Sequence, residues 1–164
     1  MLSKRIKSEI KAIETPFYLY DVGLLEHTVE RALAEADRYG YTIHYAMKAN
    51  NDRRIMEIMC SHGLGADCVS GNEVRWAIEC GIPASGIVYA GVGKKDSEII
   101  YSLEQGIFSF NCESREELEV INSIAAAMGV TAEVALRINP DVDPQTHKYV
   151  TTGKAENKFG ISYK

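Results

Sequence analysis

Lys48 stands where a predicted strand gives way to a turn, and a lysine in that position could do chemistry. The stretch Tyr41–Met47 is rich in β-branched and aromatic residues, which pack well on a pleated sheet, and Ala49 and Asn50 begin the turn. Parallel sheets collect their reactive groups at the carboxyl ends of their strands. A lysine there could form a Schiff base with a carbonyl group if its surroundings favour the neutral amine. The alternative is a solvated lysine at a strand end.

Two further charged residues stand out by their positions. Arg137 lies inside the apolar run Val134–Ile138, where a cation that points into a closed core needs a carboxylate partner. The alternative is an outward orientation, toward the helices. Ser70 and Glu73 have the spacing of a capping box, in which the serine hydroxyl and the glutamate carboxylate both accept hydrogen bonds from backbone N–H groups at a helix start.

Apolar runs and helical stretches alternate from Tyr41 onwards. Short apolar runs predict strands over residues 41–47, 64–69, 87–90, 108–110 and 134–138, and amphipathic spacing predicts helices over 51–62, 71–80, 96–104 and 114–128. Successive βα units with right-handed crossovers build a parallel sheet. Ahead of them, residues 1–40 are predicted to form a lead-in, with a strand over 17–20 and a helix over 22–39.

Two parallel architectures suit this alternation. An open doubly wound sheet would carry the glycine fingerprint GxGxxG after its first strand, and a lysine stands there instead. The predicted fold class is therefore α/β, as a partial (β/α)8 TIM-type barrel with about five of its eight units in residues 41–164. A whole barrel needs about 250 residues. The chain is therefore expected to be a segment of a longer one.

Residues 139–158 show neither a helical nor a strand period. They are polar and contain two prolines and one glycine. A loop of this length inside a compact domain is usually functional or mobile. We expect it to form a lid over the carboxyl end of the fifth strand, with His147 inside it. Residues 141–157 of this loop are expected to be mobile without ligand.

Composition excludes several classes of protein. The net charge is −5 and the basic residues are scattered, which argues against a nucleic-acid partner. No apolar run approaches the roughly 18 residues of a membrane span. The four cysteines lack metal-ligand spacing, so we expect no metal site, reduced thiols and a cytoplasmic location.

Seven stretches of the chain resemble one family of enzymes. They are TPFYLYD, YAMKAN, GADCVSGNE, FNCES, LRINPDVD, HKYVTTGK and NKFGI. Together they are similar to the N-terminal portion of the diaminopimelate decarboxylases, which are fold-type III enzymes with an alanine-racemase-like barrel and pyridoxal 5′-phosphate as cofactor. The resemblance runs from about Thr15 to Ile161.

The resemblance implies roles for individual residues. Lys48 would carry the cofactor as a Schiff base, and Asp67 and Arg137 would lie near it, with Arg137 paired to a carboxylate such as Asp67 or Glu73. Glu73 would lie near the cofactor as well as in its capping box, and His147 matches a histidine of the family's loop. The alternatives are a loop-holding role for Asp67 and a solvated position for His147.

The family's reaction converts meso-diaminopimelate to L-lysine and CO2 in a homodimer, as a step of lysine biosynthesis. The family's phosphate-binding glycines, proton donor and second domain would lie beyond Lys164, so the 164 residues alone are expected to be inactive. Two other functions stay open. One is a related decarboxylase of ornithine, arginine or carboxynorspermidine, and the other is a non-catalytic barrel homologue that binds a protein partner.

Overall fold

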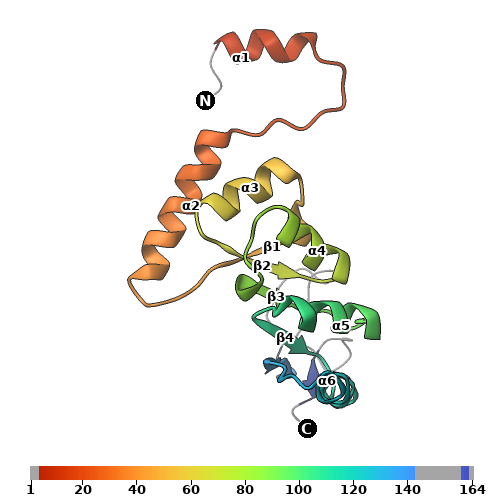
Figure 1. The fold of residues 1–164 in the computed structure, drawn as a ribbon. Helices are drawn as coiled ribbons and strands as arrows, with labels where there is room; N and C mark the ends of the chain where they lie inside the picture. Colours follow the sequence, from red (N-terminus) through yellow and green to blue (C-terminus); the bar gives the residue numbers. More distant parts are fainter. Residues whose placement is uncertain (1–3, 143–159, 163–164) are drawn as a thin grey trace.

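The computed structural model describes residues 4–142 and 160–162. Five strands form one parallel sheet, and their order in the sheet is their order along the chain (Figure 1). They are β1 (His44–Ala46), β2 (Gly65–Cys68), β3 (Ile87–Tyr89), β4 (Ser109–Cys112) and β5 (Val134–Leu136). A doubly wound sheet reverses its strand order at a switch point, and this sheet does not. The predicted partial barrel is the architecture that fits.

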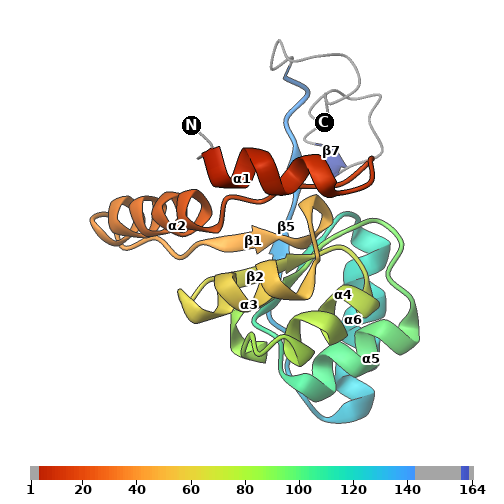
Figure 2. The same ribbon diagram turned by 90° about the horizontal axis from the view of Figure 1, so that it is seen from above.

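A helix follows each of the first four strands. These helices are α3 (Arg53–Ser61), α4 (Gly71–Glu79), α5 (Asp96–Gln105) and α6 (Arg115–Met128), with the short 3-10 helix η3 (Ala84–Gly86) ahead of β3. Figures 1 and 2 show all four helices on the same side of the sheet. Crossover helices that all lie on one side are the mark of a sheet that curls into a barrel with these helices outside.

Local sequence explains where the helices begin and end. Asp52 before α3, Ser70 before α4 and Ser114 before α6 each accept a hydrogen bond from a backbone N–H of the first turn, at 3.0–3.2 Å. Gly106 and Gly129 end α5 and α6 in the left-handed conformation, which glycine adopts without steric cost.

The main core lies between the sheet and its helices. Alternate strand residues point into it, namely Ala66, Cys68, Ile87, Tyr89, Phe110 and Cys112. Because side chains alternate across a strand, Asp67 and Asn111 face the opposite side of the sheet. A second, smaller core joins α2 (Val22–Asp37) to α3 and β1 through Val29, Ile55, Met59 and Leu64.

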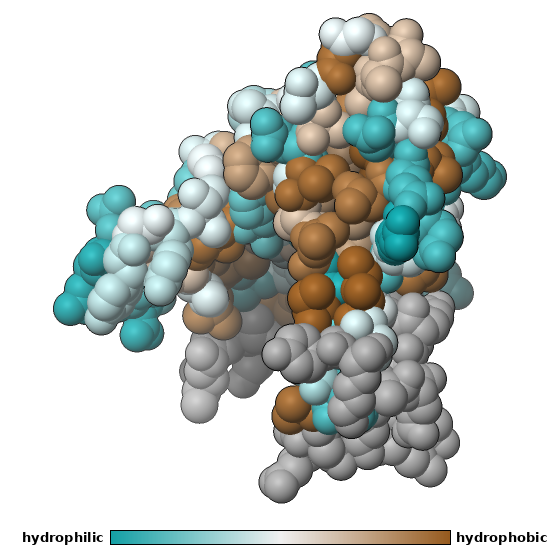
Figure 3. Space-filling view, turned by 90° about the horizontal axis from the view of Figure 1, so that it is seen from below, coloured by the Kyte–Doolittle hydropathy of each residue, from teal (hydrophilic) through white to brown (hydrophobic). Residues whose placement is uncertain are grey.

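The edge strands of this sheet are β1 and β5, each of which has a single neighbour in it. Val134 and Leu136 of β5 are 39% and 52% exposed. Figure 3 shows apolar side chains gathered in the middle of the face seen from below.

Among the described residues no helix is long and apolar enough to cross a membrane.

Two strand predictions were wrong in detail. Residues 17–20 form no strand and are largely exposed, because β-propensity alone makes no strand without a neighbour to pair the backbone. The fifth predicted strand divides into β5 and β6 (Ile138–Asn139), and β6 leaves the sheet to pair with β7 (Ile161–Ser162). The lead-in contains α1 (Lys4–Glu9) and η1 (Ile10–Ala12). The domain division at residue 40 stays a prediction.

Gly65 in β2 is the tightest point of the strand packing. The His44 ring nitrogen Nδ1 lies 3.1 Å from the carbonyl oxygen of Gly86, and it must donate because a carbonyl only accepts. A Cβ on residue 65 would lie 2.3 Å from that oxygen and 2.4 Å from Nδ1. We expect Gly65→Ala to lower the free energy of unfolding by about 1–3 kcal/mol, a typical cost of overpacking.

Urea unfolding measures this effect, and Gly93→Ala is the matched control. Nothing lies within 4 Å of a Cβ at residue 93, so the control should leave stability nearly unchanged. Equal stabilities of the two variants would contradict the packing described for His44.

The Glu98 carboxylate joins α5, α4 and β3. It accepts hydrogen bonds from Lys95 N at 3.0 Å, Gly71 N at 3.1 Å and the Tyr89 hydroxyl at 3.1 Å. Burial acts to raise the pKa of Glu98, but these donors outweigh burial and hold the pKa below its ordinary value of 4.5. A carboxylate whose folded pKa is depressed stabilises the fold above its unfolded pKa, and the stabilisation is lost as the pH falls through the folded pKa.

We therefore expect Glu98→Gln to be less stable than wild type by about 1 kcal/mol at neutral pH. The difference should shrink as the pH falls below about 4.5. Urea unfolding at several pH values checks this, with the exposed Glu104→Gln of the same helix as the control. A stability difference that is independent of pH would show that the ionised carboxylate is not what matters.

Candidate functional site

A cavity of about 500 Å³ opens at the carboxyl ends of the strands. Its lining residues come from the end of every strand of the sheet: Lys48, Asp67, Val69, Ala90, Gly91, Asn111, Glu113, Ala135, Leu136 and Arg137. Lys48, Asp67 and Arg137, the three residues predicted from the sequence as a group, thus lie in one cavity. The edge at which the strands end is where parallel sheets place their sites.

Lys48 lies in the 3-10 helix η2 (Met47–Ala49) directly after β1, so it follows the strand by two residues. The neighbouring Met47 is 1% exposed, and its sulfur accepts a hydrogen bond from the Cys68 thiol at 3.4 Å. Burial, followed by the charges of Glu73 and Asp67, raises the pKa of Cys68, which keeps the thiol protonated as a donor. The buried Met47 anchors the turn, and the Lys48 amine makes no hydrogen bond or ion pair with any described residue.

Asp67 lies in β2, directly opposite Ala46 of β1 in the ladder. Its Oδ1 is buried and has no hydrogen-bond partner among the described residues. A buried carboxylate oxygen without a donor costs free energy, and native proteins satisfy nearly all such atoms. The orphaned oxygen therefore favours a bound group that donates a hydrogen bond at this place.

Arg137 follows β5, where its backbone N–H donates to Cys112 O at 2.9 Å. Its guanidinium NH1 donates to Glu113 Oε1 at 3.1 Å. The sequence correctly indicated that Arg137 needs a carboxylate, but the expectation of Asp67 or Glu73 as that carboxylate was wrong. Glu113 directly follows β4, the strand beside β5, so it is closer to Arg137 than either of the others in the order of the sheet.

Glu73 occupies the capping position predicted for it. Its backbone N–H donates to Ser70 Oγ at 3.2 Å, and its Oε2 accepts from Val69 N at 2.7 Å, one residue earlier than the expected Ser70 N. Glu73 lines a separate, more open cavity with Asn51, Ser70, Asn72 and Trp76. The structure therefore supports the capping role, and a role beside the cofactor stays a prediction.

His147 and the predicted lid fall largely outside the described residues, which resume at Gly160. The described residues contain no cluster of three or more histidine, cysteine, aspartate or glutamate side chains suited to a metal. Cys60, Cys68, Cys80 and Cys112 are free thiols.

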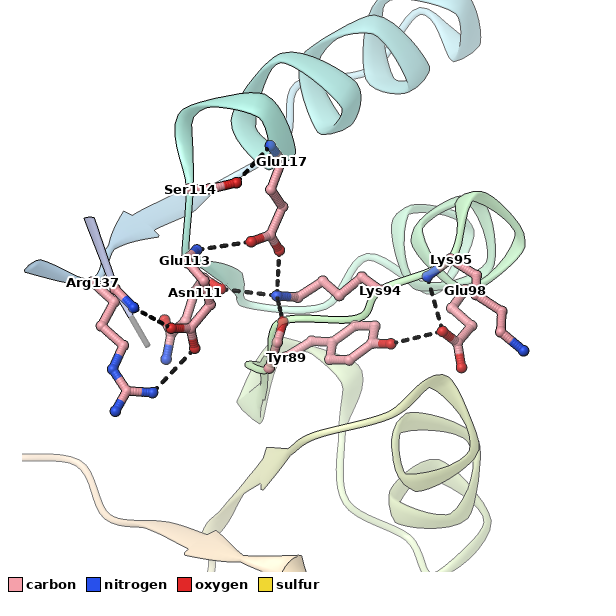
Figure 4. Close-up of polar contacts among 11 residues, drawn as sticks. Tyr89, Lys94, Lys95, Glu98, Asn111, Glu113, Ser114, Glu117 and Arg137 are labelled. Atoms are coloured by element: carbon pink, nitrogen blue, oxygen red, sulfur yellow. Dashed lines mark hydrogen bonds and ion pairs between the residues drawn. The ribbon is translucent and has the colours of Figure 1, made fainter. Parts of the chain in front are cut away.

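Sequence reasoning missed Glu113, Asn111 and Lys94. Glu113 directly follows an apolar strand, and Lys48 also comes shortly after one. This position at a strand end could have indicated from the sequence that Glu113 belongs to the site. Lys94 resembled half of an exposed lysine pair in the sequence. In the structure its side chain is 1% exposed and is enclosed by hydrogen-bond acceptors (Figure 4).

Parallel βα units in chain order form a barrel domain, and at its strand ends a lysine amine and a buried carboxylate oxygen have no partner among the described residues. The chain belongs to the pyridoxal-dependent decarboxylase family, whose pyridoxal binding domain matches residues 23–164.

Relatives within this family support the assignment. Diaminopimelate decarboxylase of Bacteroides thetaiotaomicron is 53% identical over 155 residues, which are 94% of this chain and 40% of that protein. The Zymomonas mobilis diaminopimelate decarboxylase is 46% identical over 151 residues, or 90% of this chain and 36% of that protein. The crystal structure of diaminopimelate decarboxylase from Helicobacter pylori complexed with L-lysine has a TM-score of 0.85 and 38% identity, covering 96% of this chain and 40% of that one.

These comparisons confirm two predictions, the partial barrel and the resemblance to the diaminopimelate decarboxylases. This chain spans only 40% of the length of the Bacteroides thetaiotaomicron relative and 36% of the length of the Zymomonas mobilis relative. The family implies pyridoxal 5′-phosphate as the cofactor. The residues present fit that group, since the cavity is lined by an amine and a buried carboxylate oxygen that have no partner in the part of the chain that the structure describes.

The orphaned oxygen of Asp67 leads to a stability prediction. We expect Asp67→Asn to raise the free energy of unfolding of the cofactor-free protein by about 1 kcal/mol, because a neutral amide is less costly to bury than an unpaired carboxylate. Functional sites commonly carry such a stability cost.

Urea unfolding without cofactor is the measurement, with the exposed Glu133→Gln as the control for loss of a negative charge. A clear loss of stability in Asp67→Asn would instead support the alternative in which Asp67 holds the loop after β2.

Proposed function

We propose that this chain is the cofactor-binding part of a diaminopimelate decarboxylase, which removes the α-carboxylate of meso-diaminopimelate as CO2 and yields L-lysine. The observation that carries the proposal is the Lys48 amine, which has no partner within residues 4–142 and 160–162 and lies in one cavity with the buried Asp67 Oδ1. The similarity to diaminopimelate decarboxylases over at least 90% of this chain supports the choice of substrate.

Each site residue has a proposed task. Lys48 holds the cofactor covalently through its amine, and Asp67 accepts a hydrogen bond from the bound group. Arg137 supplies a fixed positive charge in the cavity wall. Glu73 fixes the start of α4, and His147 is a site residue carried by the predicted loop. When bound, pyridoxal phosphate supplies an electron sink that stabilises the electrons left by the departing carboxylate.

The hydrogen bonds distinguish Lys48 from the other lysine near the strand ends. Lys94 Nζ donates to Gly91 O and Asn111 O at 2.9 Å and to the Glu117 carboxylate, so all three of its N–H groups are used. An amine must lose a proton and expose its lone pair before it attacks a carbonyl. Lys94 would have to break these hydrogen bonds first, whereas the Lys48 amine has no acceptor among the described residues.

The whole protein's activity is proposed for a chain of the relatives' length. We infer that the residues that complete the site come from outside residues 1–164, and that the protein is a cytoplasmic homodimer. We expect residues 1–164 alone to lack activity, because β1 and β5 are open edges of the sheet that the described residues form, and a closed barrel has no such edges.

Covalent trapping tests the site. After incubation with pyridoxal phosphate and reduction with borohydride, peptide mapping should find the pyridoxyl group on Lys48 and not on Lys94. Lys48→Ala should abolish labelling and reduce decarboxylation by several orders of magnitude, because the loss of a covalent catalytic group removes a whole reaction step. The exposed Lys95→Ala is the control. Labelling of Lys94 alone would overturn the assignment.

A substrate comparison tests the reaction in the full-length protein. CO2 release should have the highest kcat/KM with meso-diaminopimelate among a panel that includes ornithine, arginine and carboxynorspermidine. A higher kcat/KM with one of the other amines would identify the protein as a related decarboxylase that acts on that amine. Labelled Lys48 without release from any of them would favour a non-catalytic homologue.

A further inference from the structure

Two ion pairs lie at and directly behind the cavity wall formed by the ends of β3, β4 and β5. Lys94 pairs with Glu117, and Arg137 pairs with Glu113 (Figure 4). They are connected, because Glu117 Oε2 also accepts a hydrogen bond from the backbone N–H of Glu113 at 2.7 Å. Of these four residues only Arg137 was predicted from the sequence to belong to the site.

The Lys94 ammonium ties two strand ends to a helix. One acceptor is the carbonyl oxygen of Gly91, which follows β3, and another is the carbonyl oxygen of Asn111, which belongs to β4. Both residues line the cavity. Its third acceptor is the carboxylate of Glu117 in the first turn of α6. Because a buried ammonium needs every one of these partners, their relative positions are fixed.

Glu113 continues this network toward the cavity. Its carboxylate is 4% exposed, and both of its oxygens are used. Oε1 accepts from Arg137 NH1 at 3.1 Å, and Oε2 accepts from Gly160 N at 3.0 Å. The Arg137 side chain is 39% exposed and lies in the cavity wall. The rigid, buried carboxylate therefore holds the more exposed guanidinium.

We propose that Glu113 is a positioning residue that orients the Arg137 guanidinium for the cofactor, with Glu117 and Lys94 fixing the backbone from which Glu113 reaches. This inference rests on the proposed cofactor site. Pyridoxal phosphate is anionic, and a planar guanidinium held in one orientation binds an anion better than one that rotates freely.

The sign of the effect separates positioning from simple electrostatics. Glu113 is a negative charge beside a site for an anion, so its removal would strengthen cofactor binding if only charge mattered. If Glu113 acts by orienting Arg137, its removal weakens binding. Glu113→Gln keeps the shape and an acceptor for Gly160 N but loses the ion pair.

The measurement is the dissociation constant of pyridoxal phosphate, by titration of the cofactor-depleted full-length protein. We expect Glu113→Gln to bind roughly tenfold more weakly, about the effect of one charge-assisted hydrogen bond. The circular dichroism band of the bound cofactor should also lose intensity. Glu116→Gln is the matched control, since Glu116 is exposed in the same segment, and its affinity should equal wild type.

A double variant tests whether the effect passes through Arg137. Glu113→Gln combined with Arg137→Gln should bind no more weakly than Arg137→Gln alone, because the effect of Glu113 requires the guanidinium. Additive losses, or an unchanged or tighter dissociation constant in Glu113→Gln, would overturn the proposal. If Glu113→Gln does not fold, Glu113→Asp is measured instead. Its shorter carboxylate should weaken binding, and unchanged affinity would overturn the proposal equally.

The borohydride experiment keeps the two failures apart. Absence of a pyridoxyl group on Lys48 would refute the proposed cofactor site itself. A labelled Lys48 together with wild-type affinity of Glu113→Gln for pyridoxal phosphate would refute only the positioning role of Glu113.

Discussion

Parallel backbone pairing in chain order is the constraint on which the site depends. The register sets Ala46 opposite Asp67, Cys68 opposite Tyr89, and Cys112 opposite Leu136, so all five strands end at the same edge. Since side chains alternate across each strand, the apolar residues that pack against the helices leave their polar neighbours on the other face. A single pattern of hydrogen bonds thus builds the core and gathers the charged groups into one cavity.

A repeated glutamate ties the first turns of three helices to backbone outside them. The third residues of α4, α5 and α6 are Glu73, Glu98 and Glu117. Each carboxylate accepts a hydrogen bond from a backbone N–H that lies outside its own helix: Val69 N for Glu73, Gly71 N for Glu98 and Glu113 N for Glu117. Negative charge is also favourable at a helix N-terminus. Val69 and Glu113, which line the cavity, are therefore each tied to the first turn of the helix that follows them.

The two lysines near the strand ends show how packing assigns chemistry. Lys94 and Lys48 have the same functional group, and each follows a strand. Three acceptors surround Lys94, including the Glu117 carboxylate, so its ammonium serves as a structural cross-link. No described residue competes for the amine of Lys48. The availability of the amine, and not its residue type, distinguishes the proposed cofactor lysine.

The amino-acid sequence by itself determined the alternation of strands and helices, the helix starts at Ser70 and Ser114, and the position of Lys48 after its strand. These features are local, because periodicity, capping and turns involve residues only a few positions apart. The sequence also showed that Arg137 needs a carboxylate. The motifs around these residues were enough to indicate the family.

Only the tertiary structure decided which residues pair across the site. Arg137 meets Glu113 over 24 positions and Lys94 meets Glu117 over 23, and neither distance has a period that a sequence displays. Residues 17–20 have strong strand propensity but no neighbouring strand, so they stay unpaired. The burial of Lys94 and the orphaned oxygen of Asp67 have the same origin. A side chain's solvent exposure and hydrogen-bond partners are set by segments distant in the chain, which come together only when the strands pair in register.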